Sequence, residues 1–168
     1  MKLITNPMLE NYLKESKEIP LRTKGFSTVV DAADYEALSK TKWYLIKSAG
    51  KFPLKYAKMW KKGKTTGLHS ILMNPPKGKV VDHIDGDGLN NRRSNLRICS
   101  TSENMMNRGK QLNNTSGFKG VFRERKKWRA RIRVNGNAIY LGCFDDKLKA
   151  YEAYKKACIK YHGEYAKY

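Results

Sequence analysis

Asp82 and His83 follow the short apolar run 79–81, and a stretch rich in Gly, Asp and Asn separates them from a second apolar run, 96–98. A hard divalent cation prefers oxygen ligands, which the Asp82 carboxylate and the Asn104 side-chain amide would supply. His83 is a side chain that can take a proton from water near neutral pH. These residue types suit metal-assisted hydrolysis of a phosphodiester bond.

The elements that must position these side chains are a strand pair and a helix. The two apolar runs flank a long turn, which is typical of paired antiparallel strands. Ser100 or Thr101 can cap a helix that starts at residues 103–104, and packing of this helix on the strands would bring Asn104 near Asp82. Asn95 is expected to tie the long loop together with its amide.

This segment resembles the HNH nuclease motif, the ββα-metal fold, in the form found in homing endonucleases of phages and mobile introns. The resemblance rests on the run Asp-His-x-Asp-Gly-x-x-x-Asn-Asn-x-x-x-Asn-Leu-Arg. It implies that Asp82 and Asn104 bind one divalent metal ion, Mg²⁺ or else Mn²⁺, that His83 is the general base, and that Asn95 braces the catalytic loop. A turn whose polar residues only satisfy the backbone is the alternative, and it accounts for an isolated Asp-His pair better than for the whole run.

Composition points to nucleic acid as the partner. The 168 residues include 35 Lys and Arg against 15 Asp and Glu, a formal net charge of +20. Such an excess favours binding to a polyanion. The 40% apolar content suffices for small cores, and ten Tyr, five Phe and three Trp argue against disorder.

The three cysteines, Cys99, Cys143 and Cys158, show no Cys-x-x-Cys spacing, so neither a disulfide framework nor a zinc knuckle is expected. No apolar run reaches transmembrane length, and the first residues lead into no signal-peptide core. We expect a protein without a membrane partner that acts in the cytoplasm of a bacterial or phage-infected cell, with access to DNA.

The first part of the chain predicts a small sheet before the motif. Apolar residues at helical spacing suggest a helix over roughly the first 20 residues, and Asp31 is expected to cap a further short helix. Residues 61–66 are expected to be a basic turn. The HNH resemblance implies that His69, on a helix before the motif, faces the DNA backbone, and a solvent-exposed or core histidine is the alternative. Strands are predicted at residues 26–30, 42–46 and 54–60.

A polar, basic stretch without apolar periodicity, residues 107–116, is predicted to be a linker. It would divide a first domain, residues 1–106, with the motif at 68–106, from a second domain, residues 117–168.

The second domain predicts three strands and a helix, at residues 118–122, 128–134, 138–144 and from Asp145 to near Gly163. Alternation in the middle strand is strict. Trp128, Ala130, Ile132 and Val134 fall on one face, and Arg129, Arg131 and Arg133 fall on the other. A helix can cover the apolar face, which leaves the arginine face free to enter a major groove.

This pattern resembles the Apetala-two/ethylene-response-factor DNA-binding domain, a three-stranded sheet docked on DNA with one helix behind it. The family's arginine after Gly-Val is Phe122 here, and its third-strand tryptophan is Tyr140. Residues 107–168 carry 16 Lys and Arg against 5 Asp and Glu, as a tethering domain would. The residues expected to contact DNA are Lys119, Arg123, Arg129, Arg131, Arg133 and Tyr140, together with Arg97 and His69 of the nuclease core.

The sequence therefore predicts an α+β protein: an HNH nuclease domain with an N-terminal small sheet, followed by a three-stranded antiparallel sheet plus one helix. The predicted function is a site-directed, metal-dependent endonuclease of the homing type that acts as a monomer on double-stranded DNA and nicks one strand. One alternative is a DNA-binding regulator with an inactive nuclease core, and another is an RNA-binding protein, which would prefer single-stranded RNA to duplex DNA.

Overall fold

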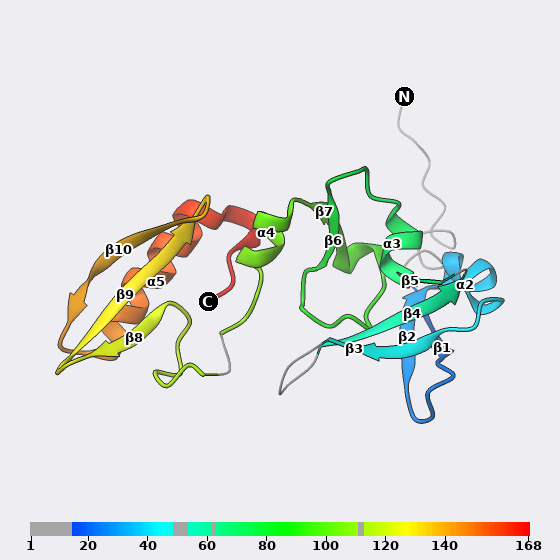
Figure 1. Ribbon diagram of the computed structural model, residues 1–168, viewed down its shortest axis with the longest axis horizontal. Helices are drawn as coiled ribbons and strands as arrows, with labels where there is room; N and C mark the ends of the chain where they lie inside the picture. Colours follow the sequence, from blue (N-terminus) through cyan, green and yellow to red (C-terminus); the bar gives the residue numbers. More distant parts are fainter. Residues whose placement is uncertain (1–14, 49–53, 62, 111–112) are drawn as a thin grey trace. The chain divides into compact units, whose positions relative to one another are not determined.

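The computed structural model describes residues 15–48, 54–61, 63–110 and 113–168. The chain divides into two compact units, Met1–Ile98 and Cys99–Tyr168 (Figure 1). Both combine helices with small sheets, as the α+β prediction requires.

The described residues of the first unit form three small sheets and two α-helices. Strand β1 pairs antiparallel with β2, β4 lies between β3 and β5, and β6 pairs with β7, whose last residue lies beyond the division between the units. Its elements are β1 (Ser16–Pro20), β2 (Ser27–Asp31), α2 (Ala32–Ser39), β3 (Tyr44–Lys47), β4 (Lys55–Lys61), β5 (Lys64–Gly67), α3 (Leu68–Met73), β6 (Val80–His83), the 3₁₀ turn η1 (Arg93–Asn95) and β7 (Leu96–Cys99).

An apolar cluster joins the first two sheets to the described helices α2 and α3 of this unit. Val30 of β2, Leu38 of α2, Ala57 of β4 and Leu68 of α3 are all buried within it. Trp43 fills its centre at 1% exposure, and its indole N–H donates to the Leu38 carbonyl at 2.8 Å. This core fixes the sheets on which the predicted catalytic loop rests.

Three predictions for this unit need correction. Residues 16–20 form β1 rather than the end of a helix, because they pair with β2; the rest of the predicted N-terminal helix lies outside the described residues. Part of the predicted basic turn is β5, which pairs with β4 despite its polar sequence. Asp31 precedes α2 but makes no side-chain cap, since its carboxylate accepts from the Arg93 backbone N–H at 2.8 Å.

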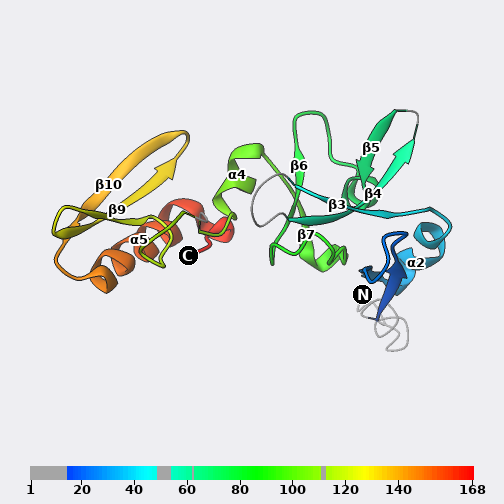
Figure 2. The same cartoon turned by 60° about the horizontal axis from the view of Figure 1, so that its bottom comes forward.

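The second unit is a three-stranded antiparallel sheet, in the order β10–β9–β8, with α5 along one face (Figures 1 and 2). Buried residues from the sheet, Ala130 and Ile132, and from the helix, Ala150 and Cys158, form its core. Its elements are α4 (Thr101–Met106), β8 (Val121–Glu124), β9 (Lys127–Val134), β10 (Asn137–Phe144), α5 (Lys147–His162) and the 3₁₀ turn η2 (Gly163–Tyr165).

The predicted sheet and helix of this unit are confirmed, with shifted ends. Strand β8 begins at Val121 rather than Phe118, because Gly120 has a positive φ of 71° and lies against the Tyr154 ring, where a Cβ would meet ring carbons at 2.0 Å. Asp146 rather than Asp145 caps α5, since its carboxylate accepts from the N–H groups of Leu148 and Lys149.

The boundary between the units differs from the predicted linker at 107–116. Helix α4 belongs to the second unit, where it contacts η2. The Lys119 ammonium donates to the carbonyl of Met106, the last residue of α4, at 2.7 Å and to the carbonyl of Lys167 at 2.9 Å. We call this pair of bonds the Lys119 clasp, and it ties the end of α4 to the C-terminal segment.

Over the described ranges, none of the helices combines the length and the apolar character needed to span a membrane.

Candidate active site

The loop between β6 and β7 is hydrogen-bonded to β2, so the N-terminal core carries it. Val29 N–H donates to the Leu89 carbonyl at 2.9 Å, and Asn91 N–H donates to the Val29 carbonyl at 2.8 Å. At the end of the loop, the Arg93 guanidinium forms two bonds of 2.8 Å with the Asp34 carboxylate of α2. These contacts hold the loop at both β2 and α2.

Asn95 holds the loop from inside. Its side-chain N–H groups donate to Asp85 Oδ1 at 2.9 Å and to the Asn90 carbonyl at 2.8 Å, and its Oδ1 accepts from the Asp85 N–H at 3.1 Å. Burial of the Asp85 carboxyl would raise its pKa, but hydrogen bonds from the Asp87 N–H, Asn90 and Asn95 lower it below its ordinary value. These bonds are the kind expected of a loop brace.

His83 is oriented by a buried polar relay. Its Nε2 lies 3.3 Å from Asn91 Oδ1, while Asn91 Nδ2 donates to Thr28 Oγ1 at 2.8 Å. The Thr28 hydroxyl in turn donates to the Leu89 carbonyl at 2.7 Å. An amide oxygen only accepts, so His83 must carry a hydrogen on Nε2, and in the neutral ring Nδ1 is then the basic nitrogen.

Two further rings surround His83. The His69 centroid lies 5.0 Å away at an interplanar angle of 80°, and the Tyr56 centroid lies 6.0 Å away. Burial lowers the pKa of His83, against the opposing effects of Asn91 and of the carboxylates at positions 85, 82 and 87. The surrounding rings and the lowered pKa both favour a neutral imidazole, the form that accepts a proton.

His69 lies on α3, and its ring forms a cluster with those of Tyr56 and His83, with ring centroids 5.0 to 6.0 Å apart. Burial, the neighbouring His83 and Lys58 lower its pKa to about 4, and its Nδ1 is buried without a hydrogen-bond partner. Gly67 leaves room for the ring, since a Cβ there would meet His69 Cε1 at 2.5 Å. Near neutral pH His69 is therefore uncharged and would meet a phosphate only through a hydrogen bond.

Asp82 is buried beside Arg97. Nε and Nη2 of Arg97 both donate to Asp82 Oδ2, at 2.9 and 2.8 Å, and the two side chains are 13% and 6% exposed. Arg97, expected from the sequence to contact DNA, thus contacts the predicted metal ligand. A positively charged group already lies against this carboxylate.

Asn104, the other predicted metal ligand, is half-buried on α4 in the second unit. Helix α4 begins with a capping box, in which Ser100 Oγ accepts from the Glu103 N–H and the Glu103 carboxylate accepts from the Ser100 N–H. Within the described part of the chain there is no group of three or more His, Cys, Asp or Glu side chains arranged to hold a metal ion.

The sheet of the second unit presents Arg129, Arg131 and Arg133 on one face, as the alternation predicts, while Ala130 and Ile132 are buried on the other. Arg131 lies over the Phe122 ring at 5.3 Å, and Arg129 lies over the exposed Tyr140 ring at 5.0 Å. Stacking on rings limits the motion of these guanidinium groups, which then lose less freedom on binding an anion.

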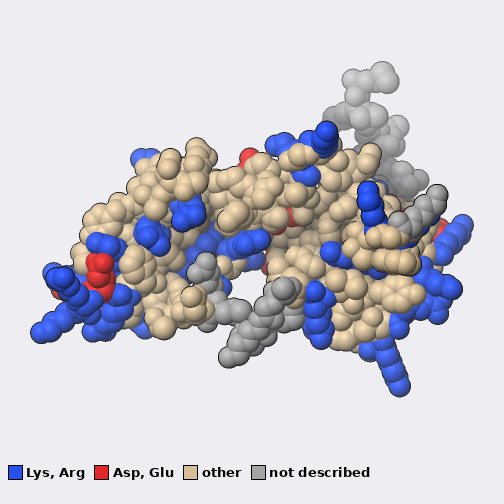
Figure 3. Space-filling model, viewed as in Figure 1, with Lys and Arg blue, Asp and Glu red and all other residues tan. Residues whose placement is uncertain are grey.

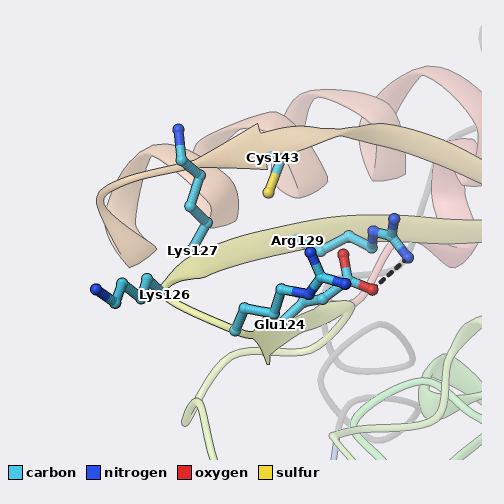
Figure 4. A pocket seen from close by; sticks show the side chains of 6 residues that line it. Glu124, Lys126, Lys127, Arg129 and Cys143 are labelled. Atoms are coloured by element: carbon cyan, nitrogen blue, oxygen red, sulfur yellow. Dashed lines mark ion pairs between the residues drawn. The ribbon is translucent and has the colours of Figure 1, made fainter.

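The outer end of this face is hollowed, and Figure 4 shows Lys126, Lys127, Arg129 and Cys143 around the hollow. Arg129 forms a 2.8 Å ion pair there with Glu124. Arg123 differs from the other arginines. It pairs with Trp128 across the strands and lies over that ring, so the register places it on the same side as the core residues.

Lys119 is partly buried rather than exposed. Its ammonium makes the two hydrogen bonds of the Lys119 clasp, and burial lowers its pKa. Both observations favour a structural use of this side chain, whereas Tyr140, Arg131 and Arg133 are exposed and Arg129 is half-buried.

The sequence did not single out Asn91, Thr28 or Tyr56 as site residues. Asn91 could have been found as the second member of the Asn-Asn pair inside the motif. Thr28 lies 63 residues away from Asn91, and no local pattern connects the two. Tyr56 looked like any other strand aromatic, yet its ring contacts both histidines and lies under Gly88, where a Cβ would meet it at 2.5 Å.

Residues 73–106 match the HNH endonuclease family. The chain carries an HNH endonuclease domain. It is 28% identical over 148 residues to the uncharacterized HNH endonuclease L560 of Acanthamoeba polyphaga mimivirus, which covers 86% of this chain and 75% of that protein.

A second relative matches a shorter part of the chain. Protein 3.8 of Escherichia phage T7 is 43% identical over 63 residues, which are 36% of this chain. The match spans about half of the phage protein, 52% of its length. No solved structure matches the chain.

Proposed function

We propose that the protein is a metal-dependent DNA endonuclease of the homing type. The observation that carries the proposal is the setting of His83: a neutral imidazole, its tautomer fixed by Asn91, next to the buried carboxylate Asp82. This is the arrangement that a general base for water requires. The match of residues 73–106 to HNH endonucleases supports the same reaction.

HNH nucleases generally use a divalent metal ion, and the donors available here suit one. Asp82 and Asn104 each offer a hard oxygen atom, and one cationic group, the Arg97 guanidinium, already lies against Asp82. Bound there, Mg²⁺ or Mn²⁺ would supply Lewis-acid stabilisation of the phosphate. His83 would take the proton from the attacking water at Nδ1, and Asn95 would keep the loop in place.

The second unit would tether the enzyme to double-stranded DNA. Support comes from the arginine face of β9, from the covering helix behind it, and from the resemblance to Apetala-two/ethylene-response-factor domains. Since one chain carries one His83-centred site, we propose a monomer that nicks one strand. We place its action in the cytoplasm of an infected bacterial cell, in keeping with its phage relative.

The test is cleavage of supercoiled plasmid with Mg²⁺ or Mn²⁺, against an EDTA control. Open circles should appear first, and the His83→Ala variant should be slower by about 10²–10⁴-fold with unchanged DNA affinity. Asp82→Ala and Asn104→Ala should also lose cleavage. DNA binding without cleavage under every metal would instead favour a regulator with an inactive core, and linear product at the initial rate would argue against nicking.

A further inference from the structure

The outer face of the β3–β4–β5 sheet carries large side chains that the core does not use. Tyr44 lies opposite Lys58 and Ile46 lies opposite Tyr56, so these four side chains share one face with Trp60. The opposite face holds Leu45, Ala57 and Met59 against the core. We call the set Tyr44, Ile46, Tyr56, Lys58 and Trp60 the outer sheet face.

The exposure of this face is unusual for its residue types. Trp60 is 69% exposed, while Trp43 in the same unit is 1% exposed. Tyr44 and Ile46 are 42% and 39% exposed, and together with Lys58 and Trp60 they line a hollow of ≈ 490 Å³. Contiguous exposed apolar surface of this kind marks an interaction site more often than isolated exposed residues do.

The surrounding charge identifies the kind of partner. Residues 42–67 contain eight Lys and no Asp or Glu. Lys58 itself lies 5.8 Å from the centroid of the Tyr56 ring, and basic side chains are frequent on the visible surface of the unit (Figure 3). Aromatic rings interleaved with lysines fit a strand of nucleic acid, whose bases stack on the rings and whose phosphates pair with the ammonium groups.

The outer sheet face also leads to the catalytic histidines. Tyr56 belongs to this face, and its ring contacts His69 at 5.8 Å and His83 at 6.0 Å between centroids. We propose that the outer sheet face binds unpaired or unstacked bases of the DNA substrate and guides that strand to His83. The proposal rests on the proposed nuclease function and adds a second DNA-binding surface, within the first unit.

The test compares two labelled DNAs with the full-length protein in EDTA, so that the DNA stays intact: a paired duplex and the same duplex with a short unpaired segment. Trp60→Ala combined with Tyr44→Ala should weaken binding to the second DNA about ten-fold and leave the paired duplex nearly unaffected. Trp60→Phe should retain most of the affinity. Tyr161→Ala, which removes an exposed ring from α5, is the matched control.

Tryptophan fluorescence gives an independent readout. Stacking of a base on Trp60 should quench the emission on titration with the unpaired DNA, and Trp60→Phe should lose this quenching. Equal affinity of the wild type and the double variant for both DNAs would overturn the proposal, even if the wild type cleaves plasmid. The selective loss in the double variant would support it even if no cleavage were found. A double variant with unchanged DNA binding but reduced self-association would show that the face binds a second copy instead.

Discussion

Arg97 contacts Asp82 through two guanidinium nitrogens that share one carboxylate oxygen, at 2.9 and 2.8 Å. Arg93, four residues earlier, contacts Asp34 with a similar bond length of 2.8 Å, but its side chain is 54% exposed. The two arginines therefore form a matched pair, one buried beside the predicted metal ligand and one at the surface.

Arg97→Gln should lower the free energy of unfolding by about 3–5 kcal/mol, because it leaves the Asp82 charge buried without this ion pair. Arg93→Gln should cost about 0–1 kcal/mol, since solvent screens the surface pair. Urea denaturation with and without Mg²⁺ measures both. Mg²⁺ should restore more stability to Arg97→Gln than to the wild type, because the cation replaces the lost guanidinium. The absence of any Mg²⁺ effect on Arg97→Gln would contradict a metal site at Asp82.

Asn91→Ala should reduce the cleavage rate at least ten-fold, because His83 loses the acceptor that fixes its tautomer. Thr28→Val is the remote counterpart: it removes the hydroxyl that bonds Asn91 and should cost about 1–3 kcal/mol of stability with a smaller loss of rate. Single-turnover cleavage and thermal denaturation separate the two effects. A wild-type rate in Asn91→Ala would rule out the relay as an orienting device.

The stability of the protein should increase between pH 4 and 6.5. His69 has a pKa of about 4 in the folded chain against an ordinary 6.5, so the unfolded chain binds more protons in this window and stability is lost as the pH falls through it. In the wild type, His69 should contribute on the order of 2–3 kcal/mol to the change in the free energy of unfolding across this window, and less where solvent reaches the ring. His69→Gln should remove this contribution. Denaturation at several pH values gives the free energy of unfolding of both proteins. The same pH dependence in the wild type and in His69→Gln would refute the prediction.

Lys119 and Arg131 should respond oppositely to replacement by alanine. Lys119→Ala breaks the Lys119 clasp and should reduce stability while hardly changing DNA affinity. Arg131→Ala should leave stability nearly unchanged but weaken DNA binding and reduce the slope of log affinity against log salt by about 1. Binding titrations over a range of salt concentrations distinguish the two. If Arg131→Ala kept the wild-type slope of log affinity against log salt, Arg131 would not contact a phosphate.

The sequence predicted elements whose signals are local. The Asn135–Gly136 turn has both residues at positive φ, 49° and 82°, as its hairpin signal requires, and α5 ends at Gly163 as expected. Contacts between distant segments were beyond such reasoning. Strand β5 has no apolar pattern and exists because β4 offers it a partner, and the partner of Asn91 is a threonine in another sheet. For the same reason, no local pattern indicated that Arg97, which is predicted to contact DNA, lies against Asp82.

The Lys119 clasp has a practical consequence for dividing this protein. A chain cut at Arg108 would keep α4 but lose Lys119, η2 and the C-terminal carbonyl that the clasp shares. A helix of six residues is not stable without tertiary contacts. Exchange of the DNA-binding part for another should therefore also destabilise α4, the helix that carries the proposed metal ligand Asn104, unless the incoming part restores the bonds of the Lys119 clasp.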